Sequence, residues 1–579
     1  MKILRAYIKE NIGILSLGAI FLTLNTFATL AIPFQISNII NLGIMKKDID
    51  MVYSTSIKMI IILIVGTATG IIANHFVALF ATNFTKKNRK LLVRNLESLT
   101  VDQVNDFGVA SLVTRMGNDN NNAQRLIVAF FQMILPSPIM AIISIFMTIK
   151  LSPTLALIPL FTILIFALAI VLTLFKSLPY ILKVQKKLDR MTLVLRERFI
   201  GAKIIRAFDN SKKERNKFND IAQEYTDNYI IINKKFALLS PMAFALMSVV
   251  ITLIIFFGAM KVLNNTLEIG SITAIVEYSL TTIAALIMSS MVLVQMPKAV
   301  VSIERIEEIL NVTSEIKDKE GLKDNSYYED ILKQNPISLT FDNVSFRYKG
   351  AEKQILKNIS FSIKVGERFA IVGATGSGKS TIAKVLLRLN DIENGKILIN
   401  GVNALDLPLN CLRNQISYTP QKAYLFSGKI KDNFRFTNKD MTDEEMIKVA
   451  KVAQSYDFID SLPDKFDSFV AQGGTNFSGG QKQRLSIARA LSKEANIYLF
   501  DDSFSALDYA TDAKLRKELK TFLKDKITII IAQRLNTIAD ADKIIVLKDS
   551  EITGMGTHQE LLESNQEYIE LAKSQGILE

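Results

Sequence analysis

A glycine-rich segment in the second half of the chain has the residue types needed to bind a phosphate group. It fits the pattern G-x-x-x-x-G-K-[ST] and consists of Gly373, Ala374, Thr375, Gly376, Ser377, Gly378, Lys379 and Ser380. An apolar run at residues 369–372 predicts a strand before it, and a helix that opens with Thr381 is expected at residues 381–389. Glycines let backbone N–H groups surround a phosphate, and the helix N-terminus favours its negative charge. We therefore expect this segment and Thr381 after it to bind the phosphate-bearing cofactor, with Lys379 reaching the β and γ phosphates and Ser380 binding Mg²⁺.

Two adjacent carboxylates follow a second predicted strand. The apolar run at residues 497–500 ends in Asp501 and Asp502. A carboxylate at a strand end beside a phosphate loop can hold the coordination shell of Mg²⁺. Alternatively, the two aspartates could simply form the turn at the end of the strand and bind no metal. Because the phosphate loop is present, we predict that Asp501 binds the metal.

The composition excludes several classes of protein. The 579 residues are 49% hydrophobic and 22% charged, which excludes a disordered or low-complexity chain. Cys411 is the only cysteine, so the sequence holds no disulfide framework and no multi-cysteine metal site. With only two histidines, His75 and His558, a histidine-rich metal centre is excluded as well.

The first half of the chain has the hydropathy of a membrane domain. A helix that crosses the hydrocarbon core needs about 20 mostly apolar residues. Six stretches meet this condition, at residues 13–36, 59–82, 126–149, 153–175, 242–263 and 271–297. The sequence therefore predicts an all-α membrane domain at residues 1–310, with six transmembrane helices embedded in a lipid bilayer.

The net charge of +13 is distributed in a way that indicates topology. Lysines and arginines gather in the two long loops after the second and fourth spans, and both loops are expected to be helical extensions beyond the bilayer. The positive-inside rule places these loops and both termini in the cytosol, with the protein in the cytoplasmic membrane. The basic surplus is thus a topology signal, and we predict no nucleic-acid partner.

The composition changes after Leu310. Residues 311–336 are polar and charged, and we expect them to form a linker. Residues 337–579 alternate between strand and helix patterns, which predicts an α/β domain around the phosphate loop. The expected fold is an all-α membrane domain fused to this α/β domain.

Further motifs of the α/β domain resemble those of ABC transporters. Residues 477–481 (FSGGQ) resemble the signature sequence, residues 505–508 (SALD) the D-loop, residues 418–421 (YTPQ) the Q-loop and residues 344–348 (VSFRY) the A-loop. The phosphate loop then corresponds to Walker A and the second strand to Walker B. Six spans followed by one nucleotide-binding domain is the layout of an ABC exporter half-transporter.

The resemblance implies roles for these residues, with ATP and Mg²⁺ as cofactors. The ring of Tyr348 would stack on adenine, whereas an aromatic residue on a strand could also serve packing alone. The implied Mg²⁺ ligands are Ser380, Gln421 and Asp501. Two such domains pair head to tail in the family, so ATP held mainly by a partner chain would meet Ser478, Gly479, Gly480 and Gln481. Patterns of the loops that dock on these domains are matched by Arg115, Asp119 and residues 197–208.

The implied catalytic residues, Gln421, Asp502 and Gln533, include two departures from the family pattern. Members that hydrolyse ATP carry Glu where this chain has Asp502. The shorter side chain withdraws the carboxylate by about 1.5 Å, and a misplacement near 1 Å can cost about 100-fold in rate. The switch histidine is replaced by Gln533, which can donate an N–H but cannot become cationic. A milder departure is Gln472, where exporters often carry Glu.

These changes predict an asymmetric pair of ATP sites. Two catalytic positions differ from the family pattern while every binding element is kept. Random decay would have eroded Walker A and the signature as well. We therefore expect one half of a heterodimeric ATP-driven exporter whose own Walker site is impaired and whose partner site is competent. The alternatives are a homodimeric exporter with slow ATPase activity and a nucleotide-sensing regulatory subunit that gates without pumping.

The spans indicate only the general class of substrate. They are rich in Phe and Met, which suit a hydrophobic or amphipathic substrate, including drugs, lipids and hydrophobic peptides, but which also suit ordinary lipid-facing packing. Glu277 lies inside the sixth span. A carboxylate there normally faces a cavity or a partner, so Glu277 is either a substrate or proton contact or a wetted structural residue.

Overall fold

The chain divides into two compact units. The first comprises Met1–Ser98 and Val104–Thr313, and the second comprises Leu99–Gln103 and Ser314–Glu579. The computed structural model describes residues 1–293, 295–323, 325–333 and 337–578.

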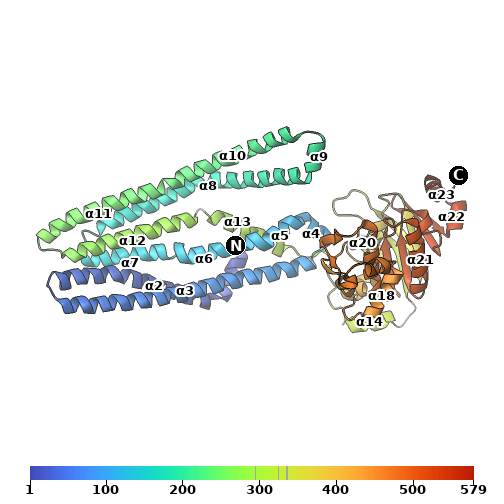
Figure 1. Cartoon of the computed structure of the whole chain (residues 1–579), viewed down its shortest axis with the longest axis horizontal. Helices are drawn as coiled ribbons and strands as arrows, with labels where there is room; N and C mark the ends of the chain where they lie inside the picture. The colour runs from blue at the N-terminus through green and yellow to red at the C-terminus, as the bar shows by residue number, and fades with distance from the viewer. Residues whose placement is uncertain (294, 324, 334–336, 579) are drawn as a thin grey trace. The chain divides into compact units, whose positions relative to one another are not determined.

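The described residues of the first unit are mainly helical (Figure 1). Three π-helical turns, η1 (Ile39–Ile44), η2 (Arg115–Asp119) and η3 (Phe130–Ile134), join consecutive helices. The α-helices are α1 (Lys2–Glu10), α2 (Ile12–Asn38), α3 (Ile49–Ser98), α4 (Val101–Phe107), α5 (Val109–Thr114), α6 (Asn120–Ala129), α7 (Pro136–Leu151), α8 (Leu157–Ile200), α9 (Ala202–Ala207), α10 (Ser211–Ala237), α11 (Leu239–Leu263), α12 (Ile269–Leu293) and α13 (Met296–Asn311).

Six helical stretches in the described chain are long and apolar enough to cross a membrane, which confirms the predicted number of spans. Several run far beyond a bilayer: α3 alone has 50 residues, or about 75 Å of helix. The sixth stretch ends at Leu293, earlier than predicted, and α13 begins at Met296 with Pro297 in its first turn. Proline is tolerated there because the first N–H groups of a helix have no intrahelical acceptor.

Polar contacts hold α13 against the turn η2. Arg115 Nη1 donates to Glu308 Oε2 at 2.6 Å. Asp119 Oδ1 accepts a hydrogen bond from Ser302 Oγ at 2.7 Å. Arg115 and Asp119, which match a docking-loop pattern, thus contact α13 within the first unit.

The second unit includes two pieces of chain from outside the α/β core. In the segment Leu99–Gln103, Asp102 Oδ2 accepts a hydrogen bond from Asn390 Nδ2 at 2.8 Å. Within the polar stretch expected to be a linker, residues 325–333 form helix α14 (Asn325–Lys333). Tyr328 and Leu332 lie one helical turn apart and form one apolar face of this helix. That face packs on the core of the unit, where Leu332 is buried and Tyr328 partly buried.

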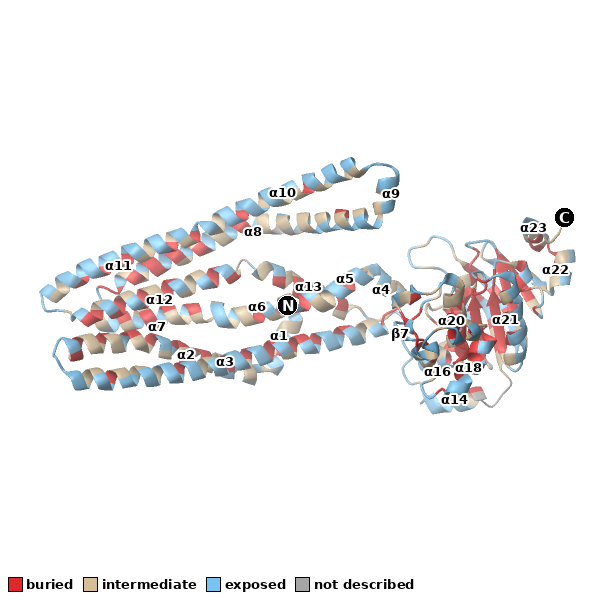
Figure 2. Ribbon diagram, viewed as in Figure 1, coloured by how far each residue is buried: buried red, intermediate tan, exposed pale blue. Residues whose placement is uncertain are grey.

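The core of the second unit is a six-stranded sheet with the order β12-β11-β3-β10-β9-β6, in which only β12 is antiparallel. Buried residues concentrate in the interior of this unit (Figure 2). A four-stranded antiparallel sheet, β2-β1-β4-β5, and the pair β7-β8 complete it. The strands are β1 (Ser338–Phe346), β2 (Leu356–Lys364), β3 (Arg368–Gly373), β4 (Asn394–Ile399), β5 (Val402–Asn403), β6 (Ile416–Thr419), β7 (Gly428–Lys429), β8 (Phe469–Val470), β9 (Ile497–Asp501), β10 (Ile527–Ile531), β11 (Lys543–Lys548) and β12 (Glu551–Gly556).

Helices cover both faces of the large sheet. Alternate residues of β3 enter different hydrophobic clusters, Ala370 and Val372 one and Phe369 and Ile371 the other, as the two-residue period of a strand requires. The helices are α15 (Lys379–Leu386), α16 (Leu409–Asn414), α17 (Ile430–Arg435), α18 (Asp443–Val452), α19 (Tyr456–Asp460), α20 (Gly479–Leu491), α21 (Tyr509–Phe522), α22 (His558–Ser564) and α23 (Gln566–Ser574). The α/β prediction and both predicted strands are confirmed, and the predicted helix at 381–389 begins two residues earlier than expected.

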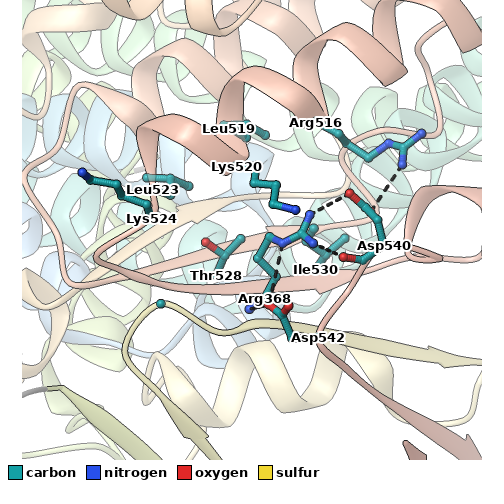
Figure 3. Close-up of a pocket in the computed structure, with 11 residues that line it drawn as sticks. Arg368, Arg516, Leu519, Lys520, Leu523, Lys524, Thr528, Ile530, Asp540 and Asp542 are labelled. Atoms are coloured by element: carbon teal, nitrogen blue, oxygen red, sulfur yellow. Dashed lines mark hydrogen bonds and ion pairs between the residues drawn. The ribbon is translucent and has the colours of Figure 1, made fainter. Parts of the chain in front are cut away.

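A cavity of about 160 Å³ lies where β3 begins, five residues from the glycine that ends the strand (Figure 3). Arg368 spans it. Its Nη1 donates to Asp540 Oδ2 at 2.7 Å, and its backbone N–H donates to Asp542 Oδ2 at 2.8 Å. Arg516 of α21 donates to the other oxygen of Asp540 at 3.5 Å. These ion pairs tie the starts of β3 and β11 to α21, at the sheet edge opposite the phosphate loop.

Removing Arg368 should destabilise this edge of the sheet. In Arg368→Met, Asp540 loses the hydrogen bond from a largely buried guanidinium group, and Asp542 loses an ion pair with Nε at 3.7 Å but keeps the backbone N–H bond. This loss costs about 1–3 kcal/mol. The apparent thermal midpoint of the second unit in the full-length protein should fall by several degrees. Lys520→Met is the matched control, since Lys520 lines the same cavity but is exposed, and its effect should stay within about 0.5 kcal/mol. Equal midpoints for the two variants would contradict this role of Arg368.

Candidate nucleotide-binding site

The phosphate loop between β3 and α15 has a backbone that only glycine fits at two positions. A Cβ at Gly373 would lie 2.2 Å from the carbonyl oxygen of Leu547. At Gly378, φ is +102° and a Cβ would lie 2.6 Å from the carbonyl oxygen of Ile355. Because only glycine tolerates such a conformation and such close approach, these two residues set the path of the loop into α15.

Lys379, the first residue of α15, is folded back over the phosphate loop. Its Nζ donates to the carbonyl oxygens of Gly373 at 2.8 Å and Ala374 at 2.7 Å. Burial lowers the pKa of this ammonium group, while the carboxylates of Asp502 and Asp501 oppose the shift. A phosphate would offer Lys379 charge-assisted hydrogen bonds, which are stronger than those to neutral carbonyl groups.

Ser380 and Asp501 meet beside the loop, as a Mg²⁺ site requires. Ser380 Oγ donates to Asp501 Oδ1 at 2.9 Å, and Tyr418 OH donates to Asp501 Oδ2 at 3.3 Å. Asp501 has an exposed fraction of only 3%, and burial raises the pKa of its carboxyl group, against the hydrogen bonds from Ser380 and Tyr418. Hydroxyl and carboxylate oxygens are ligands that Mg²⁺ prefers, so this pair fits the metal.

Asp502 is the meeting point of the three residues predicted to be catalytic. Its Oδ2 accepts hydrogen bonds from Gln421 Nε2 at 3.3 Å and from Gln533 Nε2 at 3.2 Å. Burial raises the pKa of the Asp502 carboxyl group, and the hydrogen bond from Gln421 opposes the shift. The two positions that depart from the family pattern therefore contact each other. Gln421, which was predicted to be a metal ligand, donates its side-chain hydrogen bond to Asp502 and not to the proposed metal ligands Ser380 and Asp501.

Tyr348 follows β1 and lies beside the first turns of α15. Lys384 Nζ donates to its hydroxyl group at 3.1 Å and lies 5.0 Å from the ring centroid. The hydroxyl group is also 3.4 Å from Thr381 Oγ1. Phe346 packs edge-on against the same ring, with centroids 4.9 Å apart. The structure thus brings Tyr348 next to α15, the helix that follows the phosphate loop.

The signature residues form the start of α20 and contact one another. Ser478 Oγ accepts from the backbone N–H of Gln481 at 3.3 Å, and Gln481 Oε1 accepts from that of Ser478 at 3.0 Å. Such a capping box orients the free N–H groups of a helix N-terminus. Ser478 and Gly479 are exposed. Across the described residues no hydrogen bond joins Ser478–Gln481 to the phosphate loop of the same chain.

Two neighbours of the site were not anticipated as functional residues. Tyr418 belongs to the Q-loop motif. Its hydrogen bond to Asp501 depends on the pairing of β6 with β9, in which Tyr418 is opposite Leu499. Lys384 is not part of a sequence motif. Its contact with Tyr348 joins α15 to the residues that follow β1, so it becomes visible only in the folded chain. The histidines lie elsewhere: His75 is exposed on α3, and His558 is hydrogen-bonded to Tyr568.

The fold and the site together define a nucleotide-binding ATPase domain joined to a six-helix membrane domain. Family profiles match as "ABC transporter" over residues 356–505 and as "ABC transporter transmembrane region" over residues 15–286. The ABC transporter ATP-binding protein YfiB of Bacillus subtilis is 33% identical over 543 residues, which cover 94% of this chain and 93% of YfiB. An ATP-dependent lipid A-core flippase of Mannheimia succiniciproducens is 27% identical over 572 residues, 98% of this chain and 95% of the flippase.

The chain belongs to the ABC transporter family. Its fold is that of an exporter: a solved bacterial Atm1-family ABC exporter with ATP bound superposes with a TM-score of 0.79, at 24% identity, over 96% of this chain and 97% of that one. Membership and the six apolar helices make this a multi-pass membrane protein with an ABC ATPase domain. Such a domain implies ATP binding, typically with Mg²⁺.

Replacing Lys379 should weaken ATP binding. In Lys379→Met the phosphates lose a charge-assisted donor, which costs about 1.5–3 kcal/mol, or about 10–100-fold in affinity. Equilibrium binding of a fluorescent ATP analogue to the full-length protein measures this. Lys396→Met is the matched control, since Lys396 is exposed on β4. Unchanged affinity in Lys379→Met would contradict the assignment of this lysine.

The contribution of Mg²⁺ to nucleotide affinity should fall as the pH falls. The raised pKa of Asp501 means that its carboxyl group takes up a proton above the usual range near 4, and a protonated carboxyl group is a poor Mg²⁺ ligand. The ratio of ATP affinities with Mg²⁺ and with EDTA should therefore begin to decline, as the pH is lowered from neutral, before the usual carboxyl range near 4 is reached. Asp501→Asn, in which this group cannot titrate, corrects for protonation of ATP itself. The result would be contradicted if both proteins showed the same pH dependence.

Proposed function

We propose that the protein is one half of a heterodimeric ATP-driven exporter with an asymmetric pair of ATP sites. It moves a hydrophobic or amphipathic substrate across the cytoplasmic membrane by alternating access, with the ATPase domain and both termini in the cytosol. The observation that carries the proposal is the contact between Asp502 and Gln533 beside a phosphate loop whose binding elements are kept. The lipid named in the flippase relative supports a substrate of this general class.

The chemistry of Asp502 supports slow hydrolysis at this chain's own site. A general base must accept a proton from the attacking water. One oxygen of Asp502 already accepts from the amides of Gln421 and Gln533, and the shorter side chain reaches less far toward a water. An amide at the switch position also supplies no positive charge to the γ-phosphate. Binding without rapid turnover follows.

Exposed surfaces support a partner chain. Around α9, the turn between α8 and α10, Phe199, Ile200 and Phe208 have exposed fractions of 78%, 76% and 74%. Exposed apolar clusters of this kind mark interaction sites, and residues 197–208 match a docking loop of the family. The exposed signature residues Ser478 and Gly479 likewise support ATP held by another chain. A homodimer with slow ATPase activity and a nucleotide-sensing regulatory subunit are the competing functions.

Affinity purification of the tagged chain from its native membranes, followed by mass spectrometry, tests the heterodimer. We expect a second six-span ABC chain in about equal amount, with Glu and His at the positions equivalent to Asp502 and Gln533. A pure homodimer with substantial ATPase activity would overturn the asymmetric arrangement.

Restoring the family residues should allow hydrolysis at this chain's site. In the double variant Asp502→Glu, Gln533→His, a base of full length and an imidazole are present, and general base catalysis contributes about 100-fold or more in rate. Photo-crosslinked radiolabelled nucleotide on this chain is then analysed as ATP or ADP. We expect mainly ATP in the unmodified protein and mainly ADP in the double variant, with each single variant between them. Rapid conversion to ADP in the unmodified protein would refute the impaired site.

A further inference from the structure

The exposed face of α12 differs from the exposed faces of the other long apolar helices. On α3, α8 and α11 large aliphatic and aromatic side chains point outward, as lipid contact requires; Leu63, Phe161 and Phe256 have exposed fractions of 62%, 60% and 60%. On α12 the exposed large hydrophobic residues of the described chain are Ile269, Met288 and Met291. Between Ile269 and Met288 the exposed residues are Thr273, Glu277 and Ala284, while the larger Ile272, Val276 and Leu280 are half-buried.

Glu277 lies at the centre of this less apolar stretch. Its side chain is exposed, while the next two residues, Tyr278 and Ser279, are buried in the bundle. Thr273 and Thr281 lie one helical turn away on either side, and Thr281 Oγ1 donates to the backbone oxygen of Glu277 at 2.8 Å. In the described part of the chain no hydrogen bond or ion pair engages the Glu277 carboxylate.

Glu277 lies within a helical stretch that is long and apolar enough to cross a membrane. It is the ninth of the 25 residues of α12, about 12 Å from the start of the helix at 1.5 Å per residue. A charged side chain at such depth is costly unless it faces a water-filled cavity or a charged partner. The face of α12 around Glu277 therefore faces a hydrated space rather than lipid.

The same face continues as an apolar track. Ala284, Met288 and Met291 are exposed at seven, eleven and fourteen residues beyond Glu277, or about 10, 16 and 21 Å along the axis. Alanine leaves the track flat, and methionine side chains adapt to ligands of different shape. A molecule with a charged head at Glu277 would have room for a long apolar body.

We infer that Glu277 and the track from Ala284 to Met291 form a binding site for cationic amphipathic molecules. The inference rests on the proposed export function and specifies its substrate class. The unpaired carboxylate supplies charge complementarity for a desolvated cation and repels an anionic head group, so anionic lipids are disfavoured. The two methionines hold the apolar part of the ligand by contact rather than by hydrogen bonds.

A pair of ions of opposite charge and nearly equal shape tests the site. The full-length protein, with any chain that copurifies, is placed in zwitterionic lipid nanodiscs, and binding of radiolabelled tetraphenylphosphonium and tetraphenylborate is measured without ATP, with protein-free nanodiscs subtracted. We expect Glu277→Gln to weaken binding of the cation at least tenfold and to leave binding of the anion unchanged or stronger. Glu277→Asp should retain part of the cation affinity, because the charge is kept.

Two controls separate the site from folding and from transport. Glu268→Gln makes the same chemical change just before α12, where Glu268 is exposed, and should bind both ions as the unmodified protein does. Affinity for ATP should be unchanged in Glu277→Gln, which shows that the variant is folded. Equal loss of both ions in Glu277→Gln, or no loss of either, would overturn the site. The binding assay contains no ATP, so its outcome does not depend on whether the protein exports substrate. A failure of the proposed export function would appear in the purification and nucleotide experiments above and not in this assay.

The apolar track is tested by chain length. Dodecyltriphenylphosphonium should bind more tightly than methyltriphenylphosphonium, and the double variant Met288→Ala, Met291→Ala should reduce this difference without changing the affinity for the methyl compound. An unchanged difference would limit the site to Glu277 and its two threonine neighbours, which would refute the track.

Discussion

The nucleotide site depends on the register of three parallel strands. Ile531 of β10 is paired with Ile371 of β3 on one side and with Asp501 of β9 on the other. Each chain segment leaves the sheet at this level, so the phosphate loop, the Walker B carboxylates and the switch position emerge side by side. A shift of one residue in either pairing would turn every side chain of that strand to the other face of the sheet. The buried hydrophobic residues on both faces make such a shift costly, and they thereby fix the distances between the functional groups.

The same register explains why two changes far apart in the sequence act on one reaction. Asp502 follows the end of β9 directly, and Gln533 lies two residues beyond the end of β10, so their side chains meet at 3.2 Å. An amide in place of an imidazole lets this carboxylate be held by neutral donors. The pair forms a compact polar arrangement without a cation, suited to holding a nucleotide rather than to cleaving it.

Much of this organisation could be predicted from the sequence, because the determining signals are local. The strand, loop and helix around Gly373 depend on residues that are adjacent in the chain, and the six spans depend on the length of apolar runs. The contact of Tyr418 with Asp501 could not be predicted, since it requires the order of strands in the sheet. The attachment of Arg115 and Asp119 to α13 was likewise hidden, because sequence similarity to a docking loop does not reveal which surface a side chain contacts.

The π-helical turns of the third span have a consequence for the orientation of α6. A π turn holds one residue more than an α turn, so the helix beyond it is rotated by about 100° relative to an uninterrupted α-helix. The turn η2 precedes α6 directly, and with this rotation Asn121 reaches Arg89 of α3 at 2.9 Å. Shortening η2 by one residue would carry Asn121 to another side of the helix. The extra residue of the π turn therefore determines which face of α6 packs against α3.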